Sequence, residues 1–237
     1  MIRCVFFDLD GTLIDYVSVA RAISYFNELS RYLNAGLALD DDRGKRLIDG
    51  AVGSMFEPHP GLTNQQAFDA FYDADLATDG ERVHYRELFT RFFAEVFPTL
   101  QSNECPADFG FDAVRSCQER GLTVAIASQP IFSSAAIRAR VNWAGLADLR
   151  IPLASSSETA YTTKPQLDYY REIARLLDVA PEECLMVGNE DYNDMTASQV
   201  GMRTFYVGND DQSTNGNHWS GAGTLADFIA ELDDLLR

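Results

Sequence analysis

Basic residues are scarce in this chain, which carries 19 Lys and Arg against 36 Asp and Glu and has a formal net charge of −17. A polyanion of this kind repels nucleic acid and anionic membrane surfaces, so we expect neither as a partner. It also repels a phosphorylated ligand at long range. Any phosphate site must therefore be made locally positive by a metal, a lysine and backbone N–H groups.

Cysteine, histidine and long apolar runs are also sparse. The four cysteines form no CxxC or zinc-like spacing, so the sequence offers no disulfide framework and fits a reducing compartment. The three histidines are isolated, which argues against a histidine-based metal site. No apolar stretch approaches the roughly 20 residues of a membrane helix. The first predicted strand starts directly after Met1, which leaves no room for a signal peptide. We expect a cytoplasmic protein.

The most informative feature that is present is an apolar run that ends in two carboxylates. Residues 2–7 are rich in β-formers and predict a buried strand, and Asp8-Leu9-Asp10-Gly11 follows directly. In an open α/β sheet, ligands bind at the carboxyl ends of the strands. Alternate residues share a face, so both aspartates can point into one pocket, where two like charges require a cation or a shared proton. The pattern suggests a divalent metal.

Three further elements follow in order along the chain. They are an apolar run over 122–127 that ends in Ser128-Gln129-Pro130, the pair Lys164-Pro165, and a predicted strand over 184–188 that ends in an acidic loop starting at Asn189. With the DxDGTL element at 8–13, this ordered set resembles the haloacid dehalogenase superfamily, most of whose members are phosphatases. The stretch 127–146 is similar to the helical-cap (C1) branch, which holds mostly uncharacterised hydrolases.

Strands alternate with helical patterns, which predicts an α/β fold with a mostly parallel sheet. The strands are predicted near 2–8, 122–127, 149–153, 184–188 and 203–207. Residues 208–223 are expected to form a surface loop, after which Thr224 and Asp227 predict a capping box that opens a helix over 225–236. The resemblance implies a Rossmann-like three-layer core with strand order 3-2-1-4-5.

More than a hundred residues separate the first predicted strand from the second, far more than an ordinary βα connection. Helical periodicity with much aromatic bulk lies there, over 17–33, 64–76 and 80–97. We interpret it as a helical insert with its own core, acting as a lid, and the resemblance implies an all-helical cap domain at this position. The expected division is a catalytic core over 1–15 and 99–237 and a cap over 16–98, hinged near Asp15 and at 98–102.

Two aspartates carry the predicted chemistry. A carboxylate such as Asp8 can attack phosphorus and form an aspartyl-phosphate, which splits hydrolysis into two steps. Asp10 can protonate the leaving oxygen and then accept a proton from the attacking water. By resemblance, Asp8 and the backbone carbonyl of Asp10 also bind the metal, which would be Mg²⁺.

Three residues are candidates for binding the phosphoryl group. The Ser128 hydroxyl can donate to a phosphoryl oxygen, and adjacent backbone N–H groups such as that of Gln129 can help. Lys164 is the candidate cation, placed to stabilise both Asp8 and the phosphoryl group against the negative field of the chain.

The third metal position departs from the family pattern. Related phosphatases usually carry an aspartate after the glycine that ends this strand, whereas this chain carries Asn189, whose carbonyl oxygen can still coordinate a hard cation. Asp194 matches the second acidic position of the family loop and is expected to orient Lys164 or a metal-bound water. Which of Asn189, Glu190, Asp191 and Asp194 completes the metal site stays open, although Glu190 and Asp191 are expected to face solvent or to lie at a helix N-terminus.

The leading hypothesis is a magnesium-dependent phosphohydrolase acting on a small soluble phosphomonoester. The first alternative is a metal-independent haloacid dehalogenase, in which the aspartate attacks carbon. Asp10 argues against this, because that branch typically has no aspartate there, although it can carry the residue found at Asn189. The second alternative is a non-catalytic binding protein on the same fold. The physiological substrate, the cap residues that set specificity and the oligomeric state stay open.

Overall fold

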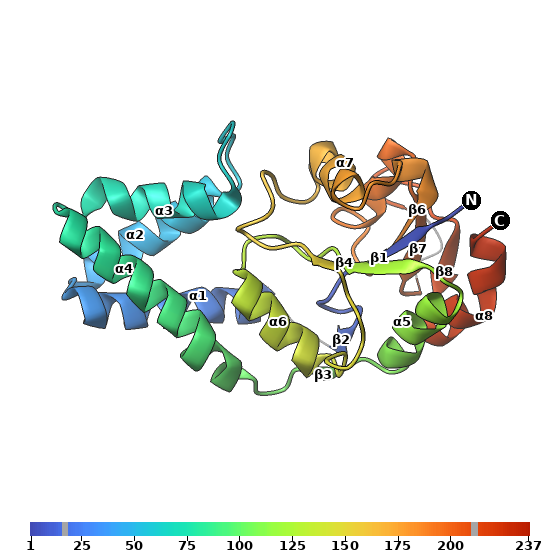
Figure 1. The fold of residues 1–237 in the computed structure, drawn as a ribbon, viewed down its shortest axis with the longest axis horizontal. Helices are drawn as coiled ribbons and strands as arrows, with labels where there is room; N and C mark the ends of the chain where they lie inside the picture. Colours follow the sequence, from blue (N-terminus) through green and yellow to red (C-terminus); the bar gives the residue numbers. More distant parts are fainter. Residues whose placement is uncertain (16–18, 210–212) are drawn as a thin grey trace.

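A parallel sheet with helices on both faces forms one end of the molecule (Figure 1). The structure is a computed structural model that describes residues 1–15, 19–209 and 213–237. Its main sheet consists of β1 (Cys4–Phe7), β4 (Thr123–Ile126), β5 (Leu153–Ala154), β6 (Cys184–Gly188), β7 (Arg203–Val207) and β8 (Gly221–Gly223). The strands lie in the order β5-β4-β1-β6-β7-β8, and every pair is parallel. The predicted order 3-2-1-4-5 is confirmed, with β8 added beyond β7.

Two predictions at the edges of the sheet, one of a strand and one of a loop, were wrong in part. The strand expected over 149–153 is shorter in the structure and consists of the two residues of β5. This segment lies at an edge of the sheet, and Pro152 has no N–H to donate to a neighbouring strand. The loop expected over 208–223 ends in β8, whose Gly-Ala-Gly sequence has low β-propensity. Its backbone pairs with β7 all the same, and a side-chain pattern cannot reveal such pairing.

The residues of β1 alternate between two apolar layers, as a strand buried on both faces requires. Cys4 and Phe6 pack toward α7 (Leu167–Leu176) and the 3₁₀ turn η4 (Met195–Val200). Val5 and Phe7 belong to the layer that contains α5 (Gly110–Glu119) and α8 (Leu225–Leu235). The predicted capping box at Thr224 is present at the start of α8. The three-layer core is therefore confirmed.

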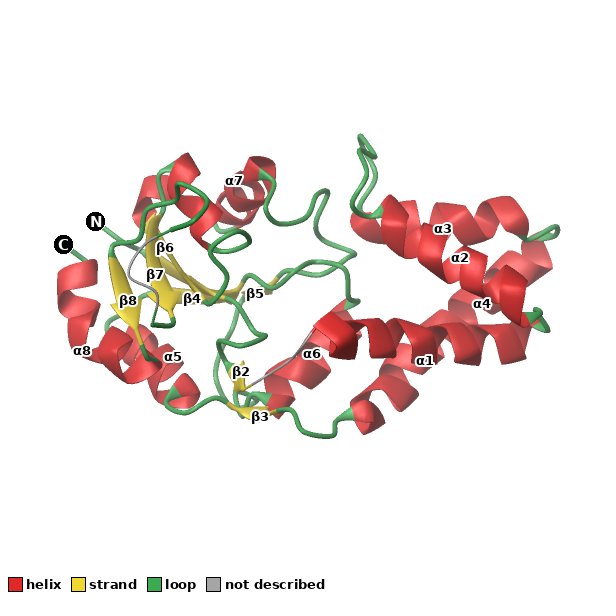
Figure 2. Ribbon diagram, turned by 180° about the vertical axis from the view of Figure 1, so that it is seen from behind, coloured by secondary structure: helices red, strands yellow, loops and turns green. Residues whose placement is uncertain are grey.

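The helices between β2 (Ile14–Asp15) and β3 (Cys105–Pro106) lie together beyond the sheet (Figures 1 and 2). They are α1 (Val19–Leu37), α2 (Asp41–Ser54), α3 (Asn64–Asp75) and α4 (Asp79–Arg91), followed by the π-helical turn η1 (Phe92–Val96) and the 3₁₀ turn η2 (Phe97–Leu100). No described residue within 19–98 joins the sheet. The predicted helix start at Val17 lies outside the described residues.

Helix α2 was not predicted, because its three glycines lower helix propensity by about 1 kcal/mol each. Packing explains two of them. A Cβ on Gly44 would lie 2.0 Å from the Asn34 amide, and one on Gly50 would lie 2.2 Å from the Phe71 ring. Neighbouring helices therefore approach α2 closely at two positions where a local sequence pattern favours a loop.

The apolar core of the helical segment is continuous with that of the sheet domain. The rings of Tyr25 and Phe97 are tilted against each other with their centroids 5.0 Å apart. Phe97 also lies 5.4 Å from Trp143 of α6 (Ser134–Trp143), and Tyr25 lies 6.0 Å from Phe132. One apolar cluster therefore runs from the sheet into the helices. We propose the division at 16–98 on the helical content of this segment alone.

The chain segment that leads into the helices and the one that returns from them run side by side. β2 pairs antiparallel with β3, which joins the outgoing and returning chain. The remaining short element is η3 (Pro181–Glu183), before β6. None of the helices in the described ranges combines the length and hydrophobicity that crossing a bilayer needs.

Candidate active site

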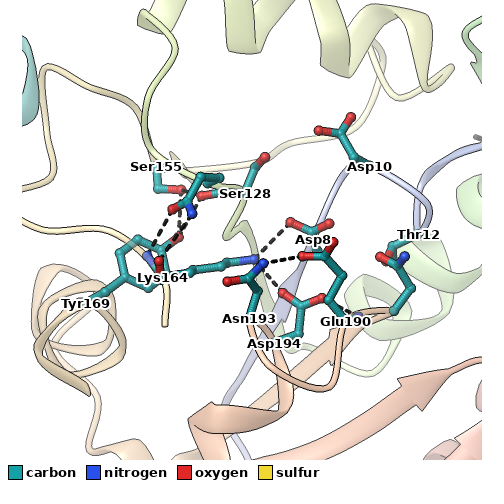
Figure 3. Close-up of polar contacts among 12 residues, drawn as sticks. Asp8, Asp10, Thr12, Ser128, Ser155, Lys164, Tyr169, Glu190, Asn193 and Asp194 are labelled. Carbon is teal, nitrogen blue, oxygen red and sulfur yellow. Dashed lines mark hydrogen bonds and ion pairs between the residues drawn. The ribbon is translucent and has the colours of Figure 1, made fainter. Parts of the chain in front are cut away.

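The predicted site residues meet at the carboxyl edge of the sheet (Figure 3). Asp8 directly follows β1, Ser128 comes two residues after β4, and Asn189 directly follows β6. Lys164 enters from the loop between β5 and α7. A cavity of about 240 Å³ opens among them, lined by Asp8, Asp10, Ala22, Ser128, Gln129, Ile131, Phe132, Lys164, Asn189, Glu190 and Asn193. Parallel strands end at one edge, and this geometry brings distant segments of the chain together.

Lys164 lies between two buried carboxylates. Its Nζ donates to Asp8 Oδ1 at 2.9 Å and to Asp194 Oδ1 at 2.6 Å. Lys164 and Asp194 are only 3% and 1% exposed, so water does not screen the three charges. Burial alone would lower the pKa of Lys164, but the Asp194 and Asp8 carboxylates raise it well above its usual value. The lysine is therefore a permanent cation here.

Two carboxylates for one ammonium leave an excess of negative charge at Asp8. Burial, followed by the charges of Asp194 and Asp10, raises the pKa of Asp8 to about 7, although Lys164 opposes the shift. A further cation beside Asp8 would favour the ionised form. The electrostatics of the pocket therefore suit a divalent metal.

Asp10 has a partner that the sequence analysis missed. The Arg140 guanidinium, which comes from the last turn of α6, donates to Asp10 Oδ1 and lies over the Phe132 ring with Cζ 5.1 Å from its centroid. Arg140 is 1% exposed. Figure 3 shows the Asp10 carboxylate turned away from Asp8 and Lys164. The two aspartates share a cavity but point to different partners.

A sequence signal for Arg140 exists. It falls on the same helix face as the buried residues Ala136, Ile137 and Trp143 of α6. An arginine in the middle of an apolar face indicates a buried anionic partner, because an unpaired buried charge is costly. Arg138, two residues earlier, is exposed as a solvated arginine would be.

Hydrogen bonds join the loop that carries Ser128 to the loop that carries Lys164. Ser128 lines the cavity, and its backbone carbonyl accepts from Ser155 Oγ at 2.9 Å and from the Tyr169 hydroxyl at 3.0 Å. The Gln129 side chain accepts from Lys164 N at 2.9 Å and donates to Lys164 O at 3.2 Å. Both ends of the Gln129 side chain are thus engaged, so any phosphate contact by this residue falls to its backbone.

Oxygen donors suited to magnesium surround the cavity. Asn189 Oδ1 accepts from the Thr12 hydroxyl at 3.1 Å. A Cβ on Gly11 would lie 2.4 Å from Asn189 Nδ2, so the asparagine packs tightly against the backbone after Asp10. Within the described ranges, no group of three His, Cys, Asp or Glu side chains is arranged so that it could hold a metal ion together. A metal at this edge would therefore depend on Asp8, on Asn189 and on backbone oxygen, and these hard donors fit Mg²⁺.

The three acidic residues of the loop after β6, Glu190, Asp191 and Asp194, make different contacts. Asp194 accepts from Lys164 with one oxygen and from Glu190 N at 3.0 Å with the other. Glu190 lines the cavity. The Asp191 carboxylate accepts from Ser213 Oγ at 2.7 Å and from other groups of the loop 213–217, which it fastens to its own loop.

A family model described as haloacid dehalogenase-like hydrolase matches residues 2–200. Among solved structures, a HAD phosphatase from Thermococcus onnurineus aligns with a TM-score of 0.58 and 19% identity over 98% of each chain. The L-2-haloacid dehalogenase RSc1362 aligns with a TM-score of 0.58 and 20% identity, over 98% of this chain and 99% of its own. A predicted phosphoglycolate phosphatase from Haemophilus somnus aligns with a TM-score of 0.54 and 13% identity, over 100% of this chain and 98% of its own. No curated protein matches the sequence.

Proposed function

Because the chain belongs to the haloacid dehalogenase-like hydrolases, we propose that it is a magnesium-dependent phosphohydrolase that acts on a small soluble phosphomonoester through an aspartyl-phosphate intermediate. The neighbouring folds include phosphatases and dehalogenases, so the choice between them rests on the site. The observation that carries it is a second carboxylate, Asp10, in the wall of the cavity that holds the Asp8–Lys164 pair. Hydrolysis of an ester needs a proton for the leaving oxygen, and Asp10 can supply it.

Each step uses a residue of the cavity. Asp8 Oδ attacks phosphorus, the bond from phosphorus to the ester oxygen breaks, and that oxygen takes a proton from Asp10. Water then attacks the phosphorus of the aspartyl-phosphate, Asp10 accepts its proton, and inorganic phosphate leaves with Asp8 restored. Lys164 and Ser128 stabilise the charge on the transferring oxygens. Asp10 must leave Arg140 and turn toward the ester oxygen for its part in both steps.

Magnesium would be held by Asp8, Asn189 and the backbone carbonyl of Asp10. When bound it supplies positive charge that offsets the phosphoryl oxygens and lets two anions approach each other. Side chains of the cavity supply the other contacts to the substrate. Ala22 of α1, with Ile131 and Phe132, lines the apolar side of the cavity. Its volume of about 240 Å³ favours a small leaving group.

A metal-independent dehalogenase is the second candidate, favoured by the neutral Asn189 at a position where phosphatases usually have an aspartate. In that reaction Asp8 attacks carbon, halide leaves, and water hydrolyses the resulting ester.

One pair of measurements separates the two candidates. Phosphate release from a panel of phosphomonoesters and halide release from short 2-haloacids are followed with magnesium and with a chelator. We expect phosphate release that the chelator abolishes. Asp8→Asn should remove at least about 99% of that activity, because no other nucleophile replaces the carboxylate. Thermal melting of the variant controls for folding. Halide release that persists in chelator would establish the dehalogenase instead.

A further inference from the structure

The first turn of α3, in the helical segment, is bonded to loops of the sheet domain. Asn64 is fully buried, and its Nδ2 donates to Pro130 O at 2.8 Å and to Thr162 O at 3.1 Å. Its backbone N–H donates to Ala160 O at 2.8 Å. The first N–H groups of a helix have no partner within that helix. Here the loop before Lys164 supplies one.

Gln65 adds two further hydrogen bonds between the first turn of α3 and the sheet domain. Its backbone N–H donates to Ser157 O at 2.8 Å, and its Oε1 accepts from Ser157 Oγ at 2.8 Å. Gln66, the next residue, makes no such contact. Its side chain instead accepts from Thr63 N at 2.9 Å in the capping box of α3. The docking to the sheet domain is therefore separable from the local capping of the helix.

The two carbonyls that Asn64 binds belong to the two loops of the candidate site. Pro130 directly follows Ser128 and Gln129, and Thr162 lies two residues before Lys164. The same loops are joined on their other side by the two hydrogen bonds between Gln129 and Lys164. Asn64 thus closes a ring of hydrogen bonds that joins the Ser128 and Lys164 loops.

We propose that Asn64 is a positioning residue, through which docking of α3 holds the Ser128 and Lys164 loops in their working arrangement. Its role in turnover rests on the proposed function, whereas its effect on the order of the loops does not. An asparagine is required because the position needs two donors on one short side chain. Aspartate has the same shape but would face both carbonyl oxygens with an acceptor, and alanine would leave both carbonyls without their donor.

A change of Asn64 should act on turnover more than on affinity. The loops carry groups that stabilise the charge on the transferring phosphoryl group, so their displacement affects the transition state most. A shift of about 1 Å in such groups can cost on the order of 100-fold in rate. We therefore expect Asn64→Asp to lower kcat at least about tenfold and to change KM much less.

The test compares Asn64→Asp and Asn64→Ala with the matched control Gln66→Ala, which weakens the first turn of the same helix without touching the loops. Hydrogen exchange of peptides covering 128–132 and 158–166 is measured in all three full-length variants without any substrate. We expect faster exchange in both loops for the Asn64 variants and wild-type exchange for the control. Inhibition by inorganic phosphate and the kinetics on an aryl phosphate then measure the consequence for the site.

Each outcome decides the proposal. Wild-type exchange in both loops of Asn64→Asp would overturn it, whether or not the wild-type protein hydrolyses phosphate esters. Equal effects of Gln66→Ala and Asn64→Ala on exchange and kcat would reduce Asn64 to a structural residue of α3 and would also overturn it. Faster loop exchange in a protein without phosphatase activity would support the coupling and contradict only the proposed function.

Discussion

At the scale of single residues, the charged side chains of the site lie in pairs. The pair of Asp10 and Arg140 is one of them. Replacement of Asp10 by asparagine removes both the proposed proton donor and the carboxylate partner of the buried Arg140. We expect Asp10→Asn to reduce turnover of alkyl phosphates, which have poor leaving groups, far more than that of an activated aryl phosphate. The ratio of the two rates is the measurement, because a loss of stability affects both equally. Equal losses in a variant whose thermal melting matches that of the wild type would assign Asp10 to positioning alone.

Asn189 makes the next prediction, because its neutral side chain stands where a carboxylate would bind a cation more strongly. Asn189→Asp should lower the magnesium concentration for half-maximal activity by roughly three- to tenfold, through added Coulomb attraction. Asp194→Asn should raise it and lower turnover, since Lys164 would lose a partner 2.6 Å away. Magnesium titrations of the two variants provide the check. An unmoved curve for Asn189→Asp would place the metal elsewhere.

At the scale of elements, the returning connection between the helices and the sheet carries a buried carboxylate, Glu104. It accepts from Arg21 and Tyr25 of α1 and from Ser102 N at 2.6 Å. Burial alone would raise the pKa of Glu104, but these hydrogen bonds lower it from 4.5 to about 2. These contacts hold the N-terminal part of α1 beside the hinge expected at 98–102.

The lowered pKa makes the contribution of Glu104 to stability depend on pH. Stabilisation by the ionised carboxylate is fully present above the unfolded-state pKa of about 4.5 and is lost as the pH falls through about 2. Glu104→Gln should therefore cost roughly 1–3 kcal/mol at neutral pH and progressively less below pH 4.5. Urea denaturation of both proteins at pH 7 and pH 3 measures the difference. A cost that does not shrink with acidity would rule out the carboxylate charge as its source.

At the scale of the whole molecule, the net charge of −17 opposes the approach of a phosphorylated substrate. The screening length falls from about 30 Å at 0.01 M salt to about 8 Å at 0.15 M. We expect kcat/KM for a phosphomonoester to rise roughly twofold or more over this range, with kcat little changed. Initial rates at several concentrations of an inert salt measure the effect. A fall in kcat/KM would show that local positive charge at the site outweighs the field of the chain.

Much of the fold and part of the site could be predicted from the sequence, because local patterns carry them. The apolar run before Asp8 and the capping box at Thr224 each depend on neighbours within a few residues. Carboxyl ends of parallel strands meet at one edge, so the convergence of Asp8, Ser128 and Asn189 followed from the strands alone.

Only the tertiary structure decided what these local patterns leave open. The pairing of Arg140 with Asp10 and of Asn64 with two loops joins residues 66 to 130 positions apart. Strand β8 and the glycines of α2 likewise follow from backbone pairing and close helix packing. The sequence by itself determined where the inner strands lie along the chain and the chemistry at their ends, since both follow from short-range preferences, whereas the order of the strands was implied by the family resemblance. Which buried charge faces which partner is a property of packing, because the cost of burying a charge depends on everything that surrounds it.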